Sequence, residues 1–214
     1  MGRYLLVVAG LLGLLSAPPA RGSSVEAVVI TTALGDIHLE LEAAKAPVTV
    51  ANFLRYVDTK RFDGITFYRA MKLDAEGRYA LVQGGLRGDR KKAFKPIAHE
   101  SPAATGLRHV DGAISMARLE PGSATADFFI IIGDLTSLDG TADGSDPGYA
   151  VFGRVTDGMD IIRQIVDLPR DPDAGDAAMK GQILADPVKI LAVRRAPPPA
   201  PVETPAPNAA PPTP

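Results

Sequence analysis

Side chains suited to nucleophilic or metal-assisted chemistry are few and scattered along this sequence. The chain contains no cysteine, which removes disulfides, thiolate metal ligands and cysteine nucleophiles. Its histidines, His38, His99 and His109, do not have the spacing of a metal site. Ser115 lacks the flanking glycines of a nucleophile elbow, and we interpret it as a core residue. The sequence therefore gives no indication of covalent or metal-dependent catalysis.

Two segments resemble ligand-binding loops only in part. The run from Asp139 to Asp146 has carboxylates spaced like half a calcium loop. It lacks the carboxylate at the third position and has Ala150 in place of the final glutamate, so we interpret it as an acidic turn. The glycines of 84–88 are not followed by Lys-Ser or Lys-Thr, which excludes a phosphate loop. We expect no cofactor and no metal. The net charge of −2 gives no reason to expect nucleic acid as a partner.

Arg69 and Gln83 are the polar residues of most interest, because each ends a strand-like segment. Taken alone, Arg69 would be interpreted as a surface charge. Gln83 could simply satisfy neighbouring backbone groups. Their meaning depends on the elements that carry them.

Short strands dominate the predicted elements. Apolar runs and period-two alternation, bounded by glycines, predict eight strands. These are 28–32, 37–41, 65–69, 79–83, 113–117, 128–132, 149–155 and 188–193. A helix begins at Pro47, with apolar residues at helical spacing through Val57, and a second covers 159–166. Many short strands with two isolated helices predict a mainly β fold, a closed eight-stranded antiparallel barrel capped by the helices.

Both ends of the chain differ from this region. Arg3, a short apolar run and small residues before Gly22 are typical of a secretory signal peptide, which we assign to 1–22. An uncleaved anchor is the alternative, although the run is too short to span a bilayer comfortably. Residues 196–214 are rich in proline and poor in large apolar side chains, which predicts a disordered tail. The folded domain is therefore expected over 23–195.

Several motifs occur in the order typical of one family. They are 46–54 (APVTVANFL), 67–69 (FYR), 82–85 (VQGG), 112–118 (GAISMAR), 127–130 (DFFI), 138–140 (LDG) and 151–155 (VFGRV). The region resembles the cyclophilins, peptidyl-prolyl cis/trans isomerases, over nearly all of 28–193. The ending Met116-Ala117-Arg118 and the position of Tyr149 are similar to the bacterial branch. Together with the signal peptide, this resemblance implies an exported, periplasmic isomerase.

The resemblance also implies a chemistry. An X-Pro peptide bond isomerises across a barrier of about 18–20 kcal/mol, because the nitrogen lone pair is delocalised into the carbonyl. Arg69 would stabilise the twisted amide by donating to the prolyl nitrogen, and Gln83 would hold a substrate carbonyl. Phe129 and Leu138 would form an apolar floor for the proline ring. The other groove positions implied are Leu81, Ala117, Arg118, Asp127 and Tyr149. Tyr149 could equally be a barrel residue with a bonded hydroxyl.

Some positions depart from the family pattern. Ala80 replaces the usual aromatic before Gln83, and the segment between Arg69 and Gln83 is longer than usual, with Tyr79 a candidate to fill the missing aromatic's space. Ser137 stands where cyclosporin-sensitive members carry tryptophan, so we expect weak cyclosporin binding. Arg118 replaces an asparagine whose role is mostly through the backbone. Asp127 replaces a glutamine, which puts one substrate hydrogen bond in doubt.

Two functions follow from different classes. The first is an isomerase that accelerates X-Pro isomerisation during folding of exported proteins. The second is a proline-peptide-binding or holdase module with little turnover, which Ala80 and the longer loop keep open. The partners expected are proline-containing polypeptides, and the protein is expected to be a monomer. The tail could visit the groove through its own Ala-Pro bonds, or act only as a spacer.

Overall fold

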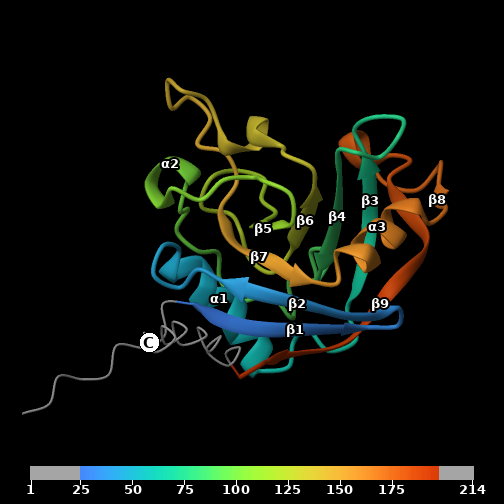
Figure 1. Cartoon of the computed structure of the whole chain (residues 1–214), viewed down its shortest axis with the longest axis horizontal. Helices are drawn as coiled ribbons and strands as arrows, with labels where there is room; N and C mark the ends of the chain where they lie inside the picture. The colour runs from blue at the N-terminus through green and yellow to red at the C-terminus, as the bar shows by residue number, and fades with distance from the viewer. Residues whose placement is uncertain (1–24, 198–214) are drawn as a thin grey trace, which may run out of the picture.

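The computed structural model describes residues 25–197. The predicted signal peptide and residues 198–214 of the predicted tail lie outside this range. Figure 1 shows the strands wrapped into a barrel, with β1 and β2 across its lower part. The strands are β1 (Glu26–Thr32), β2 (Gly35–Leu41), β3 (Thr66–Lys72), β4 (Ala80–Gly85), β5 (Ala113–Met116), β6 (Phe128–Ile132), β7 (Val151–Asp157), β8 (Arg170–Asp171) and β9 (Ile183–Arg195).

Eight of these strands close on themselves. Their order is β1-β2-β7-β5-β6-β4-β3-β9, and β9 pairs back onto β1, with every pairing antiparallel. The two-residue β8 adds to β9 alone. Closure leaves the apolar strands without an open edge. The predicted eight-stranded antiparallel barrel is therefore confirmed.

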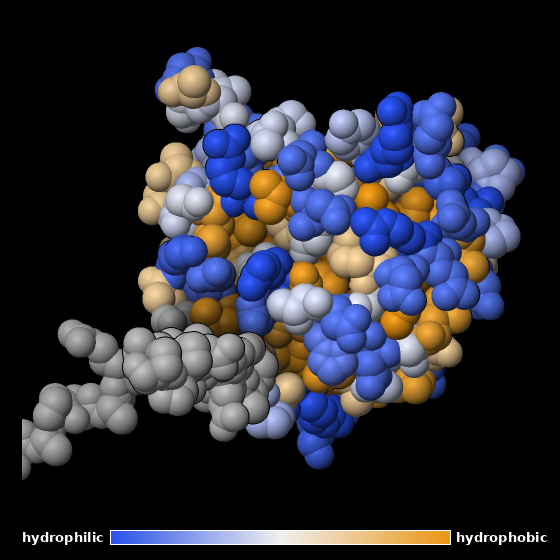
Figure 2. Space-filling view, in the orientation of Figure 1, coloured by the Kyte–Doolittle hydropathy of each residue, from blue (hydrophilic) through white to orange (hydrophobic). Residues whose placement is uncertain are grey.

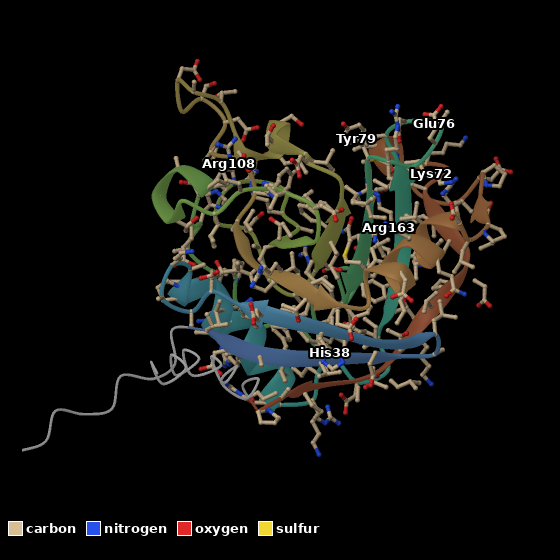
Figure 3. The ribbon with its side chains drawn as sticks, in the orientation of Figure 1. His38, Lys72, Glu76, Tyr79, Arg108 and Arg163 are labelled. Carbon is tan, nitrogen blue, oxygen red and sulfur yellow. The ribbon has the colours of Figure 1, made fainter. Side chains whose placement is uncertain are left out.

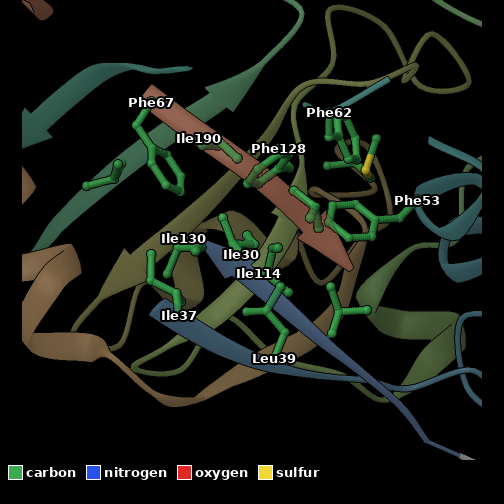
Figure 4. Close-up of a cluster of buried hydrophobic side chains, with 14 of the residues drawn as sticks. Ile30, Ile37, Leu39, Phe53, Phe62, Phe67, Ile114, Phe128, Ile130 and Ile190 are labelled. Atoms are coloured by element: carbon green, nitrogen blue, oxygen red, sulfur yellow. The ribbon is translucent and has the colours of Figure 1, made fainter. Parts of the chain in front are cut away.

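Two helices pack against the interior of the barrel, as expected. Helix α1 (Pro47–Asp58) buries Phe53 and Val57, and α3 (Met159–Asp167) buries Ile162 and Ile165. These side chains join the inward-facing strand residues in one cluster, which we call the barrel core. Figure 4 shows Phe53, Phe62, Phe67 and Phe128 with isoleucines from β1, β2 and β6. Burial of this apolar set provides the main driving force for folding.

The first turn of α1 is held by a residue distant in sequence. Ala46 at the N-cap offers no side-chain acceptor. The Glu100 carboxylate instead accepts hydrogen bonds from the backbone N–H groups of Val48 and Thr49, at 3.1 and 2.8 Å. An anion at this end also complements the helix dipole. The segment after β4 is thereby tied to α1.

Several elements were not predicted. They are the four-residue helix α2 (Pro102–Thr105) and the 3₁₀ turns η1 (Thr136–Asp139) and η2 (Ala177–Met179). Strand β9 begins five residues before its predicted start, on the far side of Pro187. The register with β3 jumps between Ile183 and Val188, so the proline falls where the ladder is interrupted. None of the helices within 25–197 has the length and apolarity needed to cross a bilayer.

The strands β4, β5 and β6, and the start of β7, carry apolar side chains on both faces. Phe128 and Ile130 belong to the barrel core, whereas Phe129 and Ile131 point the other way. The outward residues form a second cluster, which we call the outer cluster. It contains Leu81, Ala113, Phe129, Ile131, Leu135 and Val151, with Met71, Leu107, Ala117, Leu138 and Tyr149 packed around it. Packing of the barrel core alone does not explain why a second apolar cluster lies outside the barrel.

Candidate active site

A β-bulge in β3 places Tyr68 and Arg69 beside the outer cluster. The register of β3 with both β4 and β9 shifts between Phe67 and Arg69, so Tyr68 has no direct partner. Phe67 and Ala70 lie in the barrel core, and Tyr68 and Arg69 between them do not. A bulge adds one residue to a strand and changes the direction of its side chains. Two consecutive polar residues therefore reach the outside of the same strand.

The strand register aligns the candidate residues in one row. Arg69 pairs with Gln83, Gln83 with Phe129, and Phe129 with Ser115. Directly paired residues of antiparallel strands have Cβ atoms about 5 Å apart on one face. A guanidinium, an amide and an aromatic ring thus lie side by side across β3, β4 and β6.

The Arg69 guanidinium is half-buried and held on two sides. Its Nη1 donates to Gln83 Oε1 at 2.7 Å, and its Nε and Nη2 donate to Gln182 Oε1 at 2.8 and 2.6 Å. Nη2 also lies 3.7 Å from the Met71 sulfur. Burial lowers the pKa of Arg69, but an arginine remains charged at any physiological pH. Of its five N–H groups, one on Nη1 has no acceptor within 25–197.

Gln83 is oriented in turn by Tyr68. Its Nε2 donates to the Tyr68 hydroxyl at 2.6 Å, and that hydroxyl donates to Asp127 Oδ1 at 3.1 Å. Burial, followed by the nearby Asp127 charge, raises the pKa of Tyr68. Burial also raises the pKa of Asp127, against the opposing effect of the Arg87 backbone N–H at 2.8 Å. Asp127 is therefore the last acceptor in a series of hydrogen bonds that runs from Arg69 through Gln83 and Tyr68.

The glycines after Gln83 are required by close packing. A side chain at Gly84 would come within 2.9 Å of the Phe67 ring. Gly85 has φ near +137°, and a side chain there would meet the Asp127 backbone at 2.6 Å. Only glycine accommodates both this conformation and this approach. The Gln-Gly-Gly motif therefore lets Asp127 lie close enough to bond with Tyr68 and Arg87.

The predicted apolar floor lies within the outer cluster. Phe129 is 4% exposed and packs edge-to-face on Tyr149, with ring centroids 5.5 Å apart. Leu81, Ala117 and Leu138 belong to the same cluster. The structure thus brings Arg69 and Gln83 next to five predicted groove residues. The remaining two predicted groove residues, Asp127 and Arg118, have hydrogen-bond partners within the protein.

Asp127 and Arg118 make contacts within the protein. The Asp127 carboxylate is bonded to Tyr68 and to the Arg87 backbone, as described above. The Arg118 side chain is 9% exposed, and its guanidinium donates to the Gly148 carbonyl at 2.7 Å. It also lies over the Tyr149 ring, 4.7 Å from its centroid. Arg118 therefore acts through its side chain, connecting the end of β5 to the loop before Tyr149.

The acidic loop satisfies its own carboxylates. Asp143 accepts hydrogen bonds from Thr141 and from the Ser145 backbone and hydroxyl, which lower its pKa to about 2. Asp146 accepts from the Gly148 N–H and from Arg118. Within residues 25–197, no three histidine or acidic side chains converge as metal ligands.

His109 was not singled out by the sequence, yet it supports the floor. It is completely buried and stacks on Phe129, with centroids 6.0 Å apart and planes 8° from parallel. Its Nδ1 lies 2.7 Å from Asp139 Oδ1, and its Nε2 lies 3.1 Å from the Ser115 hydroxyl. Burial lowers the pKa of His109 despite the Asp139 contact. A neutral ring that donates to Asp139 and accepts from Ser115 fits both contacts.

Gln182 was also missed, because it precedes β9 in a segment without periodicity. Only tertiary pairing brings it to Arg69, 113 residues away. Tyr79 does not occupy the place of the aromatic missing at position 80. Ala80 is buried in the barrel core, whereas Tyr79 is 43% exposed. Figure 3 shows Tyr79 and Glu76 at the β3–β4 end of the molecule, with Arg108 across from them.

Apolar surface is also present outside the outer cluster. Hydrophilic side chains cover much of the face in Figure 2, with small apolar areas between them. A hollow of about 480 Å³ lies between the β1–β2 turn and the start of β9, lined by residues that include Leu34, Leu168 and Pro187. It shares no residue with the outer cluster.

Comparison with known proteins shows which family the chain is similar to. Residues 27–194 match the family described as cyclophilin type peptidyl-prolyl cis-trans isomerase/CLD. A peptidyl-prolyl cis-trans isomerase of Acinetobacter baylyi is 33% identical over 193 residues, covering 90% of this chain and 94% of the relative. Peptidyl-prolyl cis-trans isomerase A of Dickeya dadantii is 37% identical over 165 residues, covering 76% and 83%.

Solved structures show the same fold. A crystal structure of a Cryptosporidium parvum cyclophilin type isomerase superimposes with a TM-score of 0.64 at 21% identity, covering 81% of this chain and 98% of the other. A second crystal structure of that protein, in the presence of the dipeptide Ala-Pro, gives the same TM-score at 22% identity, covering 80% and 99%. Family match, relatives and barrel agree, and the chain belongs to the cyclophilin-type peptidyl-prolyl cis-trans isomerases.

Proposed function

We propose that this isomerase accelerates X-Pro isomerisation in exported polypeptides, with Arg69 as the catalytic residue and the outer cluster as the proline site. The observation that carries the proposal is the row Arg69–Gln83–Phe129. It sets a fixed positive charge beside an apolar floor that the barrel does not need for its own core.

Arg69 is suited to the transition state rather than to the ground state. A planar prolyl amide has no lone pair free on nitrogen, whereas the twisted amide does. The Nη1 hydrogen without an acceptor within 25–197 can donate to that nitrogen only when the bond is twisted. A rate increase of about 10⁵-fold requires about 7 kcal/mol of such differential stabilisation. A charged donor in a half-buried site, with the proline ring held in place, supplies both electrostatic and orientational contributions.

The floor fixes the proline ring beside that donor. Phe129 presents a ring held by His109 on one side and Tyr149 at its edge. Leu81 and Leu138 complete an apolar surface that suits a pyrrolidine ring. The Ala-Pro dipeptide used with the Cryptosporidium parvum relative supports a proline-containing ligand.

Turnover distinguishes this function from proline-peptide binding alone. Exchange NMR on an Ala-Pro peptide measures the cis/trans rate, and a titration of the same peptide measures affinity. We expect the protein, at amounts far below those of the peptide, to accelerate the cis/trans exchange of the peptide. Binding without accelerated exchange would instead establish the proline-binding or holdase module, with Ala80 as the departure from the family pattern to investigate first.

Action on exported proteins rests on the signal-peptide pattern of 1–22. The compartment proposed is the periplasm, and the protein is proposed to work as a monomer. Fractionation of expressing cells should place the protein in the periplasmic fraction, with an N-terminus, read by mass spectrometry, that starts near Ser23. Retention of the full-length chain in the membrane fraction would argue for an anchor.

A further inference from the structure

Gln182 docks onto β3 through both its backbone and its side chain. Its carbonyl accepts from the Ala70 N–H at 2.9 Å, next to Arg69 in the strand. Its side-chain Nε2 donates to the Ala178 carbonyl at 2.9 Å. That bond fixes which end of the amide faces Arg69, and Oε1 then accepts from both Nε and Nη2. The acceptor is therefore held in place before it meets the guanidinium.

The acceptors around Arg69 are all uncharged. Within residues 25–197 they are the amide oxygens of Gln83 and Gln182 and the sulfur of Met71. A carboxylate is the usual partner for the two-donor side of an arginine. A carboxylate here would hold the guanidinium equally well, but it would cancel the charge that the twisted amide requires. Gln182 provides the geometry without that cancellation.

Fixing Arg69 matters because its side chain is long. A free arginine side chain populates many rotamers, and it loses that freedom only when its guanidinium is held. Gln83 holds only Nη1, so the guanidinium could still rotate about that contact. Contact of Nε and Nη2 with Gln182 prevents this rotation and leaves the remaining Nη1 hydrogen directed away from Gln182.

From this geometry we infer that Gln182 is a positioning residue for Arg69, an uncharged acceptor that orients the guanidinium and preserves its charge. The inference rests on the proposed role of Arg69. It predicts that Gln182 affects kcat more than substrate affinity, because Gln182 lies behind Arg69 rather than on the floor that binds proline.

The test compares three variants in the full-length protein. Gln182→Leu removes the acceptor with little change in volume, and Gln182→Glu keeps an acceptor but adds a negative charge. Lys180→Ala changes an exposed residue of the same segment and serves as the control. Exchange NMR gives kcat and KM for an Ala-Pro peptide. The Arg69 Nε–H signal, recorded without peptide, reports whether the guanidinium is held, and thermal unfolding shows whether each variant folds.

We expect Gln182→Leu to lower kcat by about tenfold, equivalent to about 1.4 kcal/mol, with KM within about twofold. Its Arg69 Nε–H signal should broaden or exchange faster with water. Gln182→Glu should retain that signal yet remain slow, and Lys180→Ala should match the unmodified protein. An unchanged Nε–H signal in folded Gln182→Leu would overturn the inference, whatever the activity. Unmodified kcat in either Gln182 variant would also overturn it. A protein that shows no exchange before mutation would contradict the proposed function instead.

Discussion

Replacing Tyr68 by phenylalanine disconnects Gln83 from Asp127 and leaves the apolar contacts of the ring in place. The hydroxyl accepts from Gln83 Nε2 at 2.6 Å and donates to Asp127 Oδ1 at 3.1 Å. A hydrogen bond to a charged group contributes about 1.5–3 kcal/mol, and one between neutral groups about 1 kcal/mol. We expect the free energy of unfolding, measured by denaturant titration, to fall by about 2.5–4 kcal/mol.

The same change should also affect Arg69, the proposed catalytic residue. Without the hydroxyl, Gln83 Nε2 loses its acceptor, and within residues 25–197 the amide is held only by its bond to Arg69. The Oε1 acceptor is then no longer fixed in place, so Arg69 loses its orientation on that side. We expect kcat to fall by about tenfold, a loss of about 1.4 kcal/mol of transition-state stabilisation.

Tyr56→Phe is the matched control. Tyr56 is completely buried on α1, and its hydroxyl accepts from the Phe94 N–H at 2.7 Å, outside the outer cluster. This variant should lose about 1–2 kcal/mol of stability and keep its isomerase rate. If Tyr68→Phe and Tyr56→Phe lose stability and show equal, unreduced activity, the hydrogen-bonded chain through Tyr68 has no role in catalysis.

Three further predictions concern the floor and its charges. Leu138→Ala should raise KM about fivefold with little change in kcat, because the side-chain atoms removed contribute about 1 kcal/mol of apolar burial. The control Leu191→Ala, on the exposed side of β9, should not alter KM. His109 has a lowered pKa when folded, so the unfolded chain binds more protons below 6.5. Stability should therefore decrease as pH falls through this value, and His109→Gln should remove that slope; an identical slope in the variant would contradict it. Asp127 has a raised pKa when folded, so the folded state takes up the proton first as pH falls towards 3.8. The free energy of unfolding of Asp127→Asn minus that of the unmodified protein should therefore be greatest at neutral pH and should decrease on acidification. A difference that does not change with pH would show that the burial of Asp127 carries no electrostatic cost.

The sequence patterns predicted the strands well where alternation or an apolar run is uninterrupted. The segment 128–132 was predicted with both its ends, because glycine and polar residues bound five apolar residues. Strand β9 was predicted short because Pro187 normally ends a strand. The irregular register between β3 and β9 accommodates it, and that register is a property of two strands distant in sequence.

The site was partly predictable for a similar reason. Arg69, Gln83 and Phe129 belong to sequence motifs, so their proximity followed from family resemblance. The supporting residues Gln182 and His109 lie in segments without a pattern, and only the closed barrel brings them to Arg69 and Phe129. For Asp127, the sequence indicated the substitution but not its consequence. The close approach to Gly85, which buries the carboxylate, is visible only in the fold.

The most direct test of the account is Arg69→Ala, with exchange rate and affinity measured on the same Ala-Pro peptide. Arg69 is proposed to interact with the twisted amide and not with the planar one, whereas the proline ring is proposed to bind the floor around Phe129. We expect cis/trans exchange to fall by at least about a hundredfold, or about 2.7 kcal/mol, while the dissociation constant changes by less than about threefold. Exchange that persists at the unmodified rate, or falls only in proportion to lost affinity, would contradict the assignment of Arg69 as the catalytic residue.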